Sequence, residues 1–293
     1  MKILSLCGGG VRGLIQAKFL DCLQRDLDRP IREYFDVFTG TSIGGVLAAA
    51  FSHTSLSTEE ILDLFCETNI HSIFDAKWFD NVFGIVQAVP KYDGVGKTKF
   101  LESVFGESRL RETDKHILIP AYNVTLMKLK IFKETDNFSL VDVLNATTAA
   151  PSYFPPALVD GFYYIDGGVV LNDPSLSAIC EFSKFKKNCL TVSTGYDSMV
   201  HVHELTDEPQ DMGLMNWFNF GLLDIIMDVS HTKFFCERML CENFLNIDFP
   251  LQSKFELDKA TSEILAVYRD IAQDIYNSRR EEILEFLTME MYV

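Results

Sequence analysis

The chain has 293 residues, of which 47% are hydrophobic and 23% charged, and its formal net charge at pH 7 is −16. A chain of this length can bury a sizeable core, and we find no internal repeat and no low-complexity segment. The negative charge disfavours binding to nucleic acid polymers and constitutive attachment to anionic bilayers. An expected strand begins at Lys2 with no charged-then-apolar leader before it, and no apolar run reaches bilayer-spanning length, so we expect a cytoplasmic protein.

A glycine-rich loop follows the first expected strand, residues 2–6, and precedes a helix expected over 14–27. The loop reads Gly8-Gly9-Gly10-Val11-Arg12-Gly13. Its spacing also fits G-x-G-x-x-G, a dinucleotide-binding pattern that expects an acidic residue at the end of the second strand. That strand ends instead in Gly40-Thr41-Ser42, and Asp36 stands at its start. The alternative is an oxyanion hole formed by the loop amides, in which Arg12 either steers a phosphate or, as we favour, braces the loop.

A second glycine motif lies between a strand expected over 37–39 and a helix expected over 43–51. It reads Gly40-Thr41-Ser42-Ile43-Gly44, which is G-x-S-x-G. Small neighbours allow the sharp strand-to-helix turn that exposes a serine hydroxyl. The motif alone also occurs by chance in unrelated chains. Ser42 is nevertheless the first candidate for a nucleophile.

The next segment holds a helix expected over 59–69, with a capping box that starts at Ser57. The segment Gly94-Val95-Gly96-Lys97-Thr98 resembles the tail of a phosphate-binding loop, but Lys91 occupies the position of the required upstream glycine. We therefore interpret it as a loop that leads into a helix over 98–105.

The best candidate for a base is Asp166, which ends an aromatic strand expected over 163–166 and precedes Gly167 and Gly168. None of the six histidines lies in a catalytic motif. Seven cysteines form no C-x-x-C pair, so we expect reduced, buried thiols and no metal site. The remaining expected elements are strands over 116–124, 128–133 and 189–193, and helices over 140–149 and 176–185.

The glycine loop, the G-x-S-x-G motif and Asp166-Gly167-Gly168, in this order, resemble the patatin-like phospholipase family. Further similarity runs through residues 146–156 and Asn172-Asp173-Pro174, so the resemblance covers about residues 2 to 195. It implies an α/β protein with a three-layer α/β/α fold and a mostly parallel central sheet. We expect a catalytic core over 1–195 and a helical C-terminal extension over 196–293, packed on the same domain.

The resemblance implies a lipid acyl hydrolase with a Ser-Asp dyad and no cofactor. Ser42 would be the nucleophile, Asp166 the proton acceptor, and the loop from Gly8 to Gly13 the oxyanion hole. The substrate would be a phospholipid or lysophospholipid, reached by peripheral binding at a membrane surface. One departure is Cys7, since family members usually carry Asp before the three glycines.

The last third of the chain leaves several interpretations open. Residues 212–227 are rich in large apolar side chains, which either pack in the core or form an interfacial cap with Trp217 and Phe218. Residues 256–290 are expected to form a helix with a solvated acidic face. Two alternative functions remain: a cyclic-nucleotide-gated, membrane-degrading effector of a bacterial defence system, and a non-hydrolytic binding or structural protein. The sequence does not determine the oligomeric state.

Overall fold

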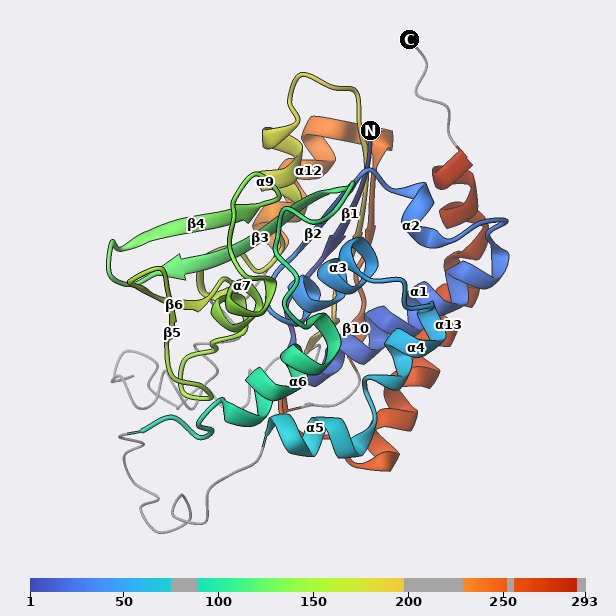
Figure 1. The fold of residues 1–293 in the computed structure, drawn as a ribbon. Helices are drawn as coiled ribbons and strands as arrows, with labels where there is room; N and C mark the ends of the chain where they lie inside the picture. Colours follow the sequence, from blue (N-terminus) through green and yellow to red (C-terminus); the bar gives the residue numbers. More distant parts are fainter. Residues whose placement is uncertain (75–88, 198–228, 252–255, 289–293) are drawn as a thin grey trace, which may run out of the picture.

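A central sheet with helices on both faces forms the body of the protein (Figure 1). The computed structural model describes residues 1–74, 89–197, 229–251 and 256–288. Among these residues, no helix combines the length and the apolar composition needed to cross a membrane.

The sheet has eight strands in the order β5-β6-β3-β2-β1-β7-β9, and β4 pairs with β3. The pairs among β1, β2, β3, β7 and β9 are parallel, whereas β4, β5 and β6 pair in antiparallel fashion. A separate parallel pair joins β8 to β10. The strands are β1 Lys2–Leu6, β2 Val37–Gly40, β3 His116–Asn123, β4 Lys128–Lys133, β5 Ala157–Val159, β6 Phe162–Asp166, β7 Asn188–Val192, β8 Tyr196–Asp197, β9 Phe244–Ile247 and β10 Pro250–Leu251.

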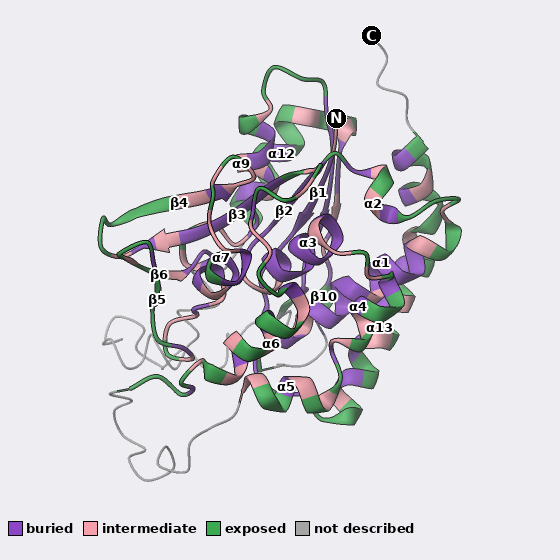
Figure 2. Cartoon of the chain, viewed as in Figure 1, coloured by how far each residue is buried: buried purple, intermediate pink, exposed green. Residues whose placement is uncertain are grey.

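Alternating side chains on the strands divide the core into two apolar layers. In β1, Leu4 and Leu6 belong to the larger layer, whereas Ile3 belongs to the smaller one. The larger layer is covered by α1 Gly13–Asp26, α3 Ile43–His53, α7 Leu140–Thr147 and α13 Ser262–Thr288, and the smaller by α9 Ser175–Glu181 and α12 Ser230–Leu240. Figure 2 shows the buried strands between these helices. The arrangement is the expected three-layer α/β/α fold.

The remaining helices are short and surround this core. They are α2 Ile31–Tyr34, α4 Thr58–Asp63, α5 Glu67–Ile73, α6 Val95–Phe105, α8 Gly168–Leu171 and the 3-10 turns η1 Gly10–Arg12 and η5 Cys241–Asn243. The capping box is confirmed: the Ser57 hydroxyl accepts from the Glu60 N–H at 3.2 Å, and the Ser57 N–H donates to the Glu60 carboxylate at 2.8 Å. The single helix expected over 59–69 is wrong, because the chain turns between α4 and α5 and the Asn69 amide donates to the Leu64 carbonyl.

The described residues of the C-terminal part include short strands as well as helices. Strand β9 pairs in parallel with β7 and so extends the central sheet. A four-residue apolar strand gives too short a pattern for its period to separate strand from helix. The expected acidic helix is confirmed over Ser262–Thr288 as α13, whereas residues 256–261 before it are not helical. This helix buries Leu265, Tyr268, Ala272 and Tyr276 and leaves its acidic side chains exposed. The apolar stretch 212–227, with Trp217 and Phe218, lies outside the described residues.

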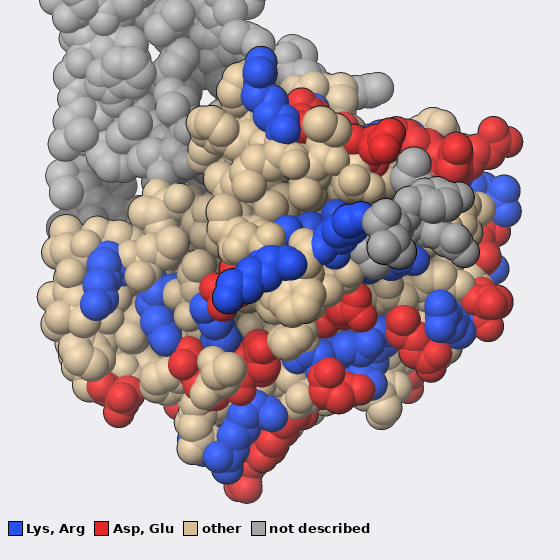
Figure 3. All heavy atoms as spheres, turned by 90° about the horizontal axis from the view of Figure 1, so that it is seen from above, with Lys and Arg blue, Asp and Glu red and all other residues tan. Residues whose placement is uncertain are grey.

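Charged side chains of both signs are interspersed on the face shown in Figure 3, where Lys and Arg lie among Asp and Glu. Surface ion pairs among the described residues include Arg279 with Glu282 at 2.7 Å. Such pairs contribute little to stability, so the fold depends mainly on its two apolar layers.

Candidate active site

Ser42 lies on a sharp turn between β2 and α3. Its backbone has φ 55° and ψ −125°, a strained conformation for a residue with a side chain. The turn is tight because a Cβ at Gly40 would lie 2.0 Å from the Gly44 carbonyl, and a Cβ at Gly44 would lie 2.2 Å from the Leu6 carbonyl. The Ser42 N–H donates to the Thr147 hydroxyl at 3.0 Å, which anchors the turn to α7.

Asp166 is the last residue of β6, and its side chain and that of Ser42 line the same cavity. The nearby Ser42 hydroxyl favours the ionised form of the Asp166 carboxyl and so lowers its pKa. The Gly168 N–H donates to the same carboxylate at 2.7 Å, and the Asp166 N–H donates to the Ala149 carbonyl at 3.0 Å. Asp166 is only 6% exposed, and this burial raises its pKa to about 6 against the opposing effect of these hydrogen bonds.

The glycine loop lies beside Ser42 because β1 and β2 are parallel neighbours, with Leu6 opposite Gly40. Four of its six amides already donate to backbone oxygens: Gly8 to Asn172 (3.2 Å), Val11 to Leu257 (2.8 Å), Arg12 to Gly9 (3.2 Å) and Gly13 to Gly10 and Val11. The described residues provide no acceptor for the amides of Gly9 and Gly10. These two amides are therefore the ones that an oxyanion could use.

Arg12 within this loop and Cys7 directly before it both have structural contacts. The Arg12 Nε donates to the Gly9 carbonyl at 3.4 Å, which braces the loop as expected. Cys7 is buried, and its carbonyl accepts from the Gln16 amide at 3.0 Å. Burial raises the pKa of the Cys7 thiol, and the nearby Asp173 adds to this effect. A neutral thiol avoids placing another buried carboxylate beside Asp173.

Ser42, Asp166, Gly9 and Gly10 line one cavity of ≈ 150 Å³. Its other walls are mostly apolar, and include Val46, Leu47, Phe65, Ile70, Phe74, Leu101, Phe154 and Leu257. A mostly apolar cavity with a serine side chain in its lining has the character of a binding site for an apolar chain.

One wall of the cavity comes from the segment between β10 and α13. Leu257 lies there, and its neighbour Asp258 is held by the Lys91 ammonium at 2.5 Å and by the Tyr92 hydroxyl at 2.6 Å. The Tyr92 ring packs against the rings of Phe74 and Phe154, with centroids 5.2 and 5.6 Å away. We call residues 256–261 the strap, because they hold the C-terminal part of the chain against the glycine loop.

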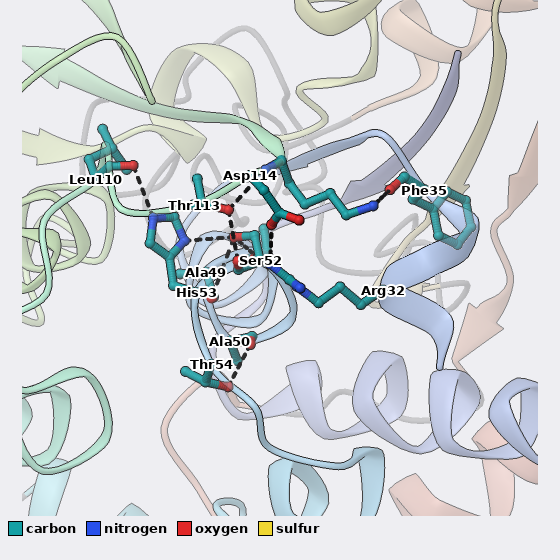
Figure 4. A network of polar contacts seen from close by, with 12 residues as sticks. Arg32, Phe35, Ala49, Ala50, Ser52, His53, Thr54, Leu110, Thr113 and Asp114 are labelled. Atoms are coloured by element: carbon teal, nitrogen blue, oxygen red, sulfur yellow. Dashed lines mark hydrogen bonds and ion pairs between the residues drawn. The ribbon is translucent and has the colours of Figure 1, made fainter. Parts of the chain in front are cut away.

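A second serine lies next to a histidine at the far end of α3, but this pair belongs to a structural network (Figure 4). The His53 Nδ1 lies 2.8 Å from the Ser52 hydroxyl and its Nε2 lies 3.0 Å from the Leu110 carbonyl. Ser52 is fully buried, and its hydroxyl also contacts the Ala48 carbonyl. Since α3 rises ~1.5 Å per residue, this pair is remote from Ser42. Burial lowers the pKa of His53.

The segment that resembles a phosphate-binding loop is instead the start of a helix. Gly94 is the N-cap of α6, so the helix begins three residues earlier than expected. Lys97 is buried and lines the same cavity as Ser42, a position that sequence reasoning missed. Thr147 and Leu257 were also missed, since both contact the site from elements distant in sequence. The described ranges contain no group of three or more His, Cys, Asp or Glu side chains that could hold a metal ion.

Comparison with known proteins identifies the family. The model of the patatin-like phospholipase family matches residues 4–179. The chain belongs to this family. Among the relatives of this patatin-like chain is the cGAMP-activated phospholipase of Pseudomonas aeruginosa, which is 30% identical over 275 residues, covering 89% of this chain and 79% of the relative. Patatin-like protein 2 of Oryza sativa subsp. indica is 28% identical over 310 residues, covering 85% and 76%.

A solved structure also resembles this fold. VipD from Legionella pneumophila matches with a TM-score of 0.50 at 13% sequence identity, covering 94% of this chain and 66% of VipD. At this low identity the likeness concerns the fold alone. The patatin-like family and its three-layer α/β/α fold therefore agree with the resemblance seen in the sequence.

Proposed function

We propose that this protein hydrolyses acyl ester bonds of phospholipids or lysophospholipids, with Ser42 as nucleophile and Asp166 as proton acceptor. The observation that carries the proposal is that Ser42 and the buried Asp166 line the same apolar cavity, where the Ser42 hydroxyl favours the ionised Asp166 carboxylate. Membership of a phospholipase family supports the substrate class. The protein would act as a serine carboxylic-ester hydrolase, bound peripherally to a membrane surface while active.

The reaction would proceed through an acyl-enzyme. As the Ser42 oxygen bonds to the ester carbonyl carbon, its proton passes to Asp166. The tetrahedral intermediate then collapses, the bond to the lysolipid oxygen breaks, and Asp166 returns the proton to that oxygen. Water attacks the acyl-serine with Asp166 again accepting a proton, and this proton returns to Ser42 as the fatty acid leaves.

The amides of Gly9 and Gly10 would donate to the oxyanion of each tetrahedral intermediate. They lie on the cavity with Ser42, and the neighbouring amides are already engaged in the loop itself. Preorganised donors of this kind stabilise developing charge without reorganisation during the reaction. The proposal thus reduces the candidate oxyanion donors from the six residues of the glycine loop to two backbone amides.

Substitution of the nucleophile tests the proposal. Fatty acid release from mixed phospholipid vesicles should fall in Ser42→Ala by roughly a millionfold, as for nucleophile removal in other serine hydrolases. Ser52→Ala is the matched control, since Ser52 lies on the same helix but far from the cavity. A fluorophosphonate probe should label wild type and Ser52→Ala and leave Ser42→Ala unlabelled. If Ser42→Ala retained more than about a tenth of the wild-type rate, Ser42 would not be the nucleophile.

A second candidate is a cyclic-nucleotide-gated effector of bacterial defence. The observation that favours it is the similarity to proteins named cGAMP-activated phospholipases, three of which are 30–33% identical to this chain. Vesicle hydrolysis that appears only after addition of cGAMP, and is absent in Ser42→Ala with cGAMP, would support gating. Equal rates with and without cGAMP and other cyclic nucleotides would contradict it.

The other alternative is a non-hydrolytic binding or structural protein with the same fold. Folded wild-type protein that releases no fatty acid in any condition, and does not react with the fluorophosphonate probe at Ser42, would favour this alternative over both hydrolases.

A further inference from the structure

A lysine is buried inside the cavity that holds the proposed dyad. Lys97 is only 7% exposed, although lysine is among the residues least often buried. Its position on α6 directs the ammonium inward, whereas Lys99 on the same helix is exposed. A buried ammonium needs compensating contacts, because removing its charge from water is costly.

The Lys97 ammonium contacts the carboxyl end of α7. It donates to the carbonyls of Asn145 at 3.3 Å and Thr148 at 3.2 Å, and lies 4.4 Å from the centre of the Phe154 ring. The last carbonyls of a helix lack partners within the helix and carry partial negative charge, which favours a cation. Lys97 therefore fastens this end of α7 to α6.

The same end of α7 supports both members of the dyad. The Thr147 hydroxyl accepts from the Ser42 N–H and donates to the Pro120 carbonyl at 2.6 Å. Two residues later, the Ala149 carbonyl accepts from the Asp166 N–H. A displacement of this helix end would thus move the nucleophile and the proton acceptor together.

Lys97 also acts on Asp166 through its charge. The two groups favour each other's charged forms, while burial opposes both. Burial lowers the pKa of Lys97 to about 7. The other titratable groups on the helices packed against α6 contribute little charge near Lys97. Asp142 on α7 and His71 on α5 are exposed, and Glu67 on α5 hydrogen-bonds with Ser262.

We propose that Lys97 is a positioning residue for the Ser42–Asp166 dyad, which holds the end of α7 and supplies the positive charge that opposes the negative charge of Asp166. The inference rests on the proposed hydrolase function. It assigns a role to Lys97, which in the sequence belongs to the segment 94–98 that resembles the tail of a phosphate-binding loop.

Three substitutions separate the two parts of this role. Lys97→Met removes both the hydrogen bonds and the charge, Lys97→Gln keeps a donor without the charge, and Lys97→Arg keeps both. Hydrolysis of p-nitrophenyl octanoate would be measured against pH, with Lys99→Met as the control on the same helix. Melting temperatures of all variants identify any that fail to fold.

We expect the acid limb of kcat/KM to move to higher pH in Lys97→Met and Lys97→Gln, by roughly one unit, the lower end of the effect of a nearby opposite charge. Lys97→Arg and Lys99→Met should keep the wild-type limb, and kcat should fall most in Lys97→Met. Folded Met and Gln variants with the wild-type limb and wild-type kcat would overturn the inference.

A titration without turnover makes this test independent of the hydrolase proposal. In protein labelled with 13C-aspartate, Asp166→Asn identifies the Asp166 signal, which should titrate at higher pH in Lys97→Gln than in wild type. An unshifted titration overturns the charge role of Lys97 whether or not the enzyme is active. Inactive wild type with a shifted titration would instead refute the hydrolase and keep the coupling.

Discussion

At the residue scale, the conformation of Ser42 shows how the fold exposes a hydroxyl. A side chain at positive φ costs about 1–3 kcal/mol, and the surrounding contacts hold it in place: Gly40 and Gly44 admit the close backbone approach, and Thr147 accepts the Ser42 N–H. This turn places Ser42 on the cavity that Asp166 also lines. In the proposed dyad, Asp166 would take the role of the histidine that many serine hydrolases use to activate the nucleophile.

The pH dependence of hydrolysis should follow Asp166. Its pKa is raised from 3.8 to about 6 by burial, so below this pH the carboxyl is protonated and cannot accept the serine proton. We expect kcat/KM of wild type to fall as pH decreases through about 6. A rate profile that stays flat down to pH 4.5, with the protein still folded, would exclude Asp166 as the base.

Replacement of the Asp166 carboxyl should remove activity and at the same time increase stability. Because the folded-state pKa lies above the unfolded value, ionised Asp166 destabilises the fold, and this penalty develops as pH rises from about 4 to 6. Asp166→Asn should be inactive yet melt at a higher temperature than wild type at pH 8, with a gain of no more than about 3 kcal/mol. At pH 4 the two proteins should melt at similar temperatures. If the stability of Asp166→Asn relative to wild type instead fell between pH 4 and pH 8, ionised Asp166 would not destabilise the fold.

At the element scale, the glycine loop is constrained by a segment distant in sequence. Gly10 has φ +58°, and a Cβ there would lie 2.3 Å from the Leu257 carbonyl. Gly106, at the end of α6, has φ +55° with nothing within 4 Å of such a Cβ. Alanine substitutions at these two glycines therefore separate two effects. Gly106 shows the cost of the backbone conformation alone, and Gly10 adds the close contact with the strap.

Gly106→Ala should lower the free energy of unfolding by about 1–3 kcal/mol, the cost of placing a side chain in this sparsely populated backbone conformation. Gly10→Ala should lower it further and reduce kcat by about a hundredfold or more, because moving the loop misplaces an oxyanion donor. Urea denaturation and steady-state kinetics would measure both effects. Equal losses of stability in the two variants would mean that the strap moves away from a Cβ at residue 10 with no loss in the free energy of unfolding.

The elements that carry the proposed site could be predicted from the sequence, because the positions of their glycines, Ser42 and Asp166 depend on short-range backbone geometry. A turn too tight for a side chain, or a strand that ends in a carboxylate, leaves a short-range pattern. Lys97 and Thr147 left none, since a helix pattern does not reveal which neighbouring helix end a side chain contacts. Strand β9 was missed for a related reason: its place beside β7 is decided by tertiary pairing and not by its four residues.

At the scale of the whole molecule, the strap connects the C-terminal part of the chain to the site. Asp258 accepts from Tyr92 and pairs with Lys91, whose side chain is 44% exposed. Hydrogen bonds to a charged group contribute about 1.5–3 kcal/mol. Asp258→Ala should therefore reduce the free energy of unfolding by about 2 kcal/mol.

The matched control is Glu256→Ala, which removes an exposed pair with Lys259 and should change stability by less than about 0.5 kcal/mol. Thermal unfolding compares the two variants directly. If both variants lost the same small amount of stability, the strap would not be held through Asp258, and its position would depend on other contacts, such as the Val11–Leu257 hydrogen bond and the burial of Ala260.

The contribution of Leu257 to the cavity has an evolutionary consequence. The family match ends at residue 179, yet this side chain forms part of the wall that would surround an acyl chain. The proposed dyad and part of the cavity wall are thus encoded in separate stretches of the gene. In the proposed hydrolase, mutations in the distal stretch would change the surroundings of the acyl chain while Ser42 and Asp166 stay the same.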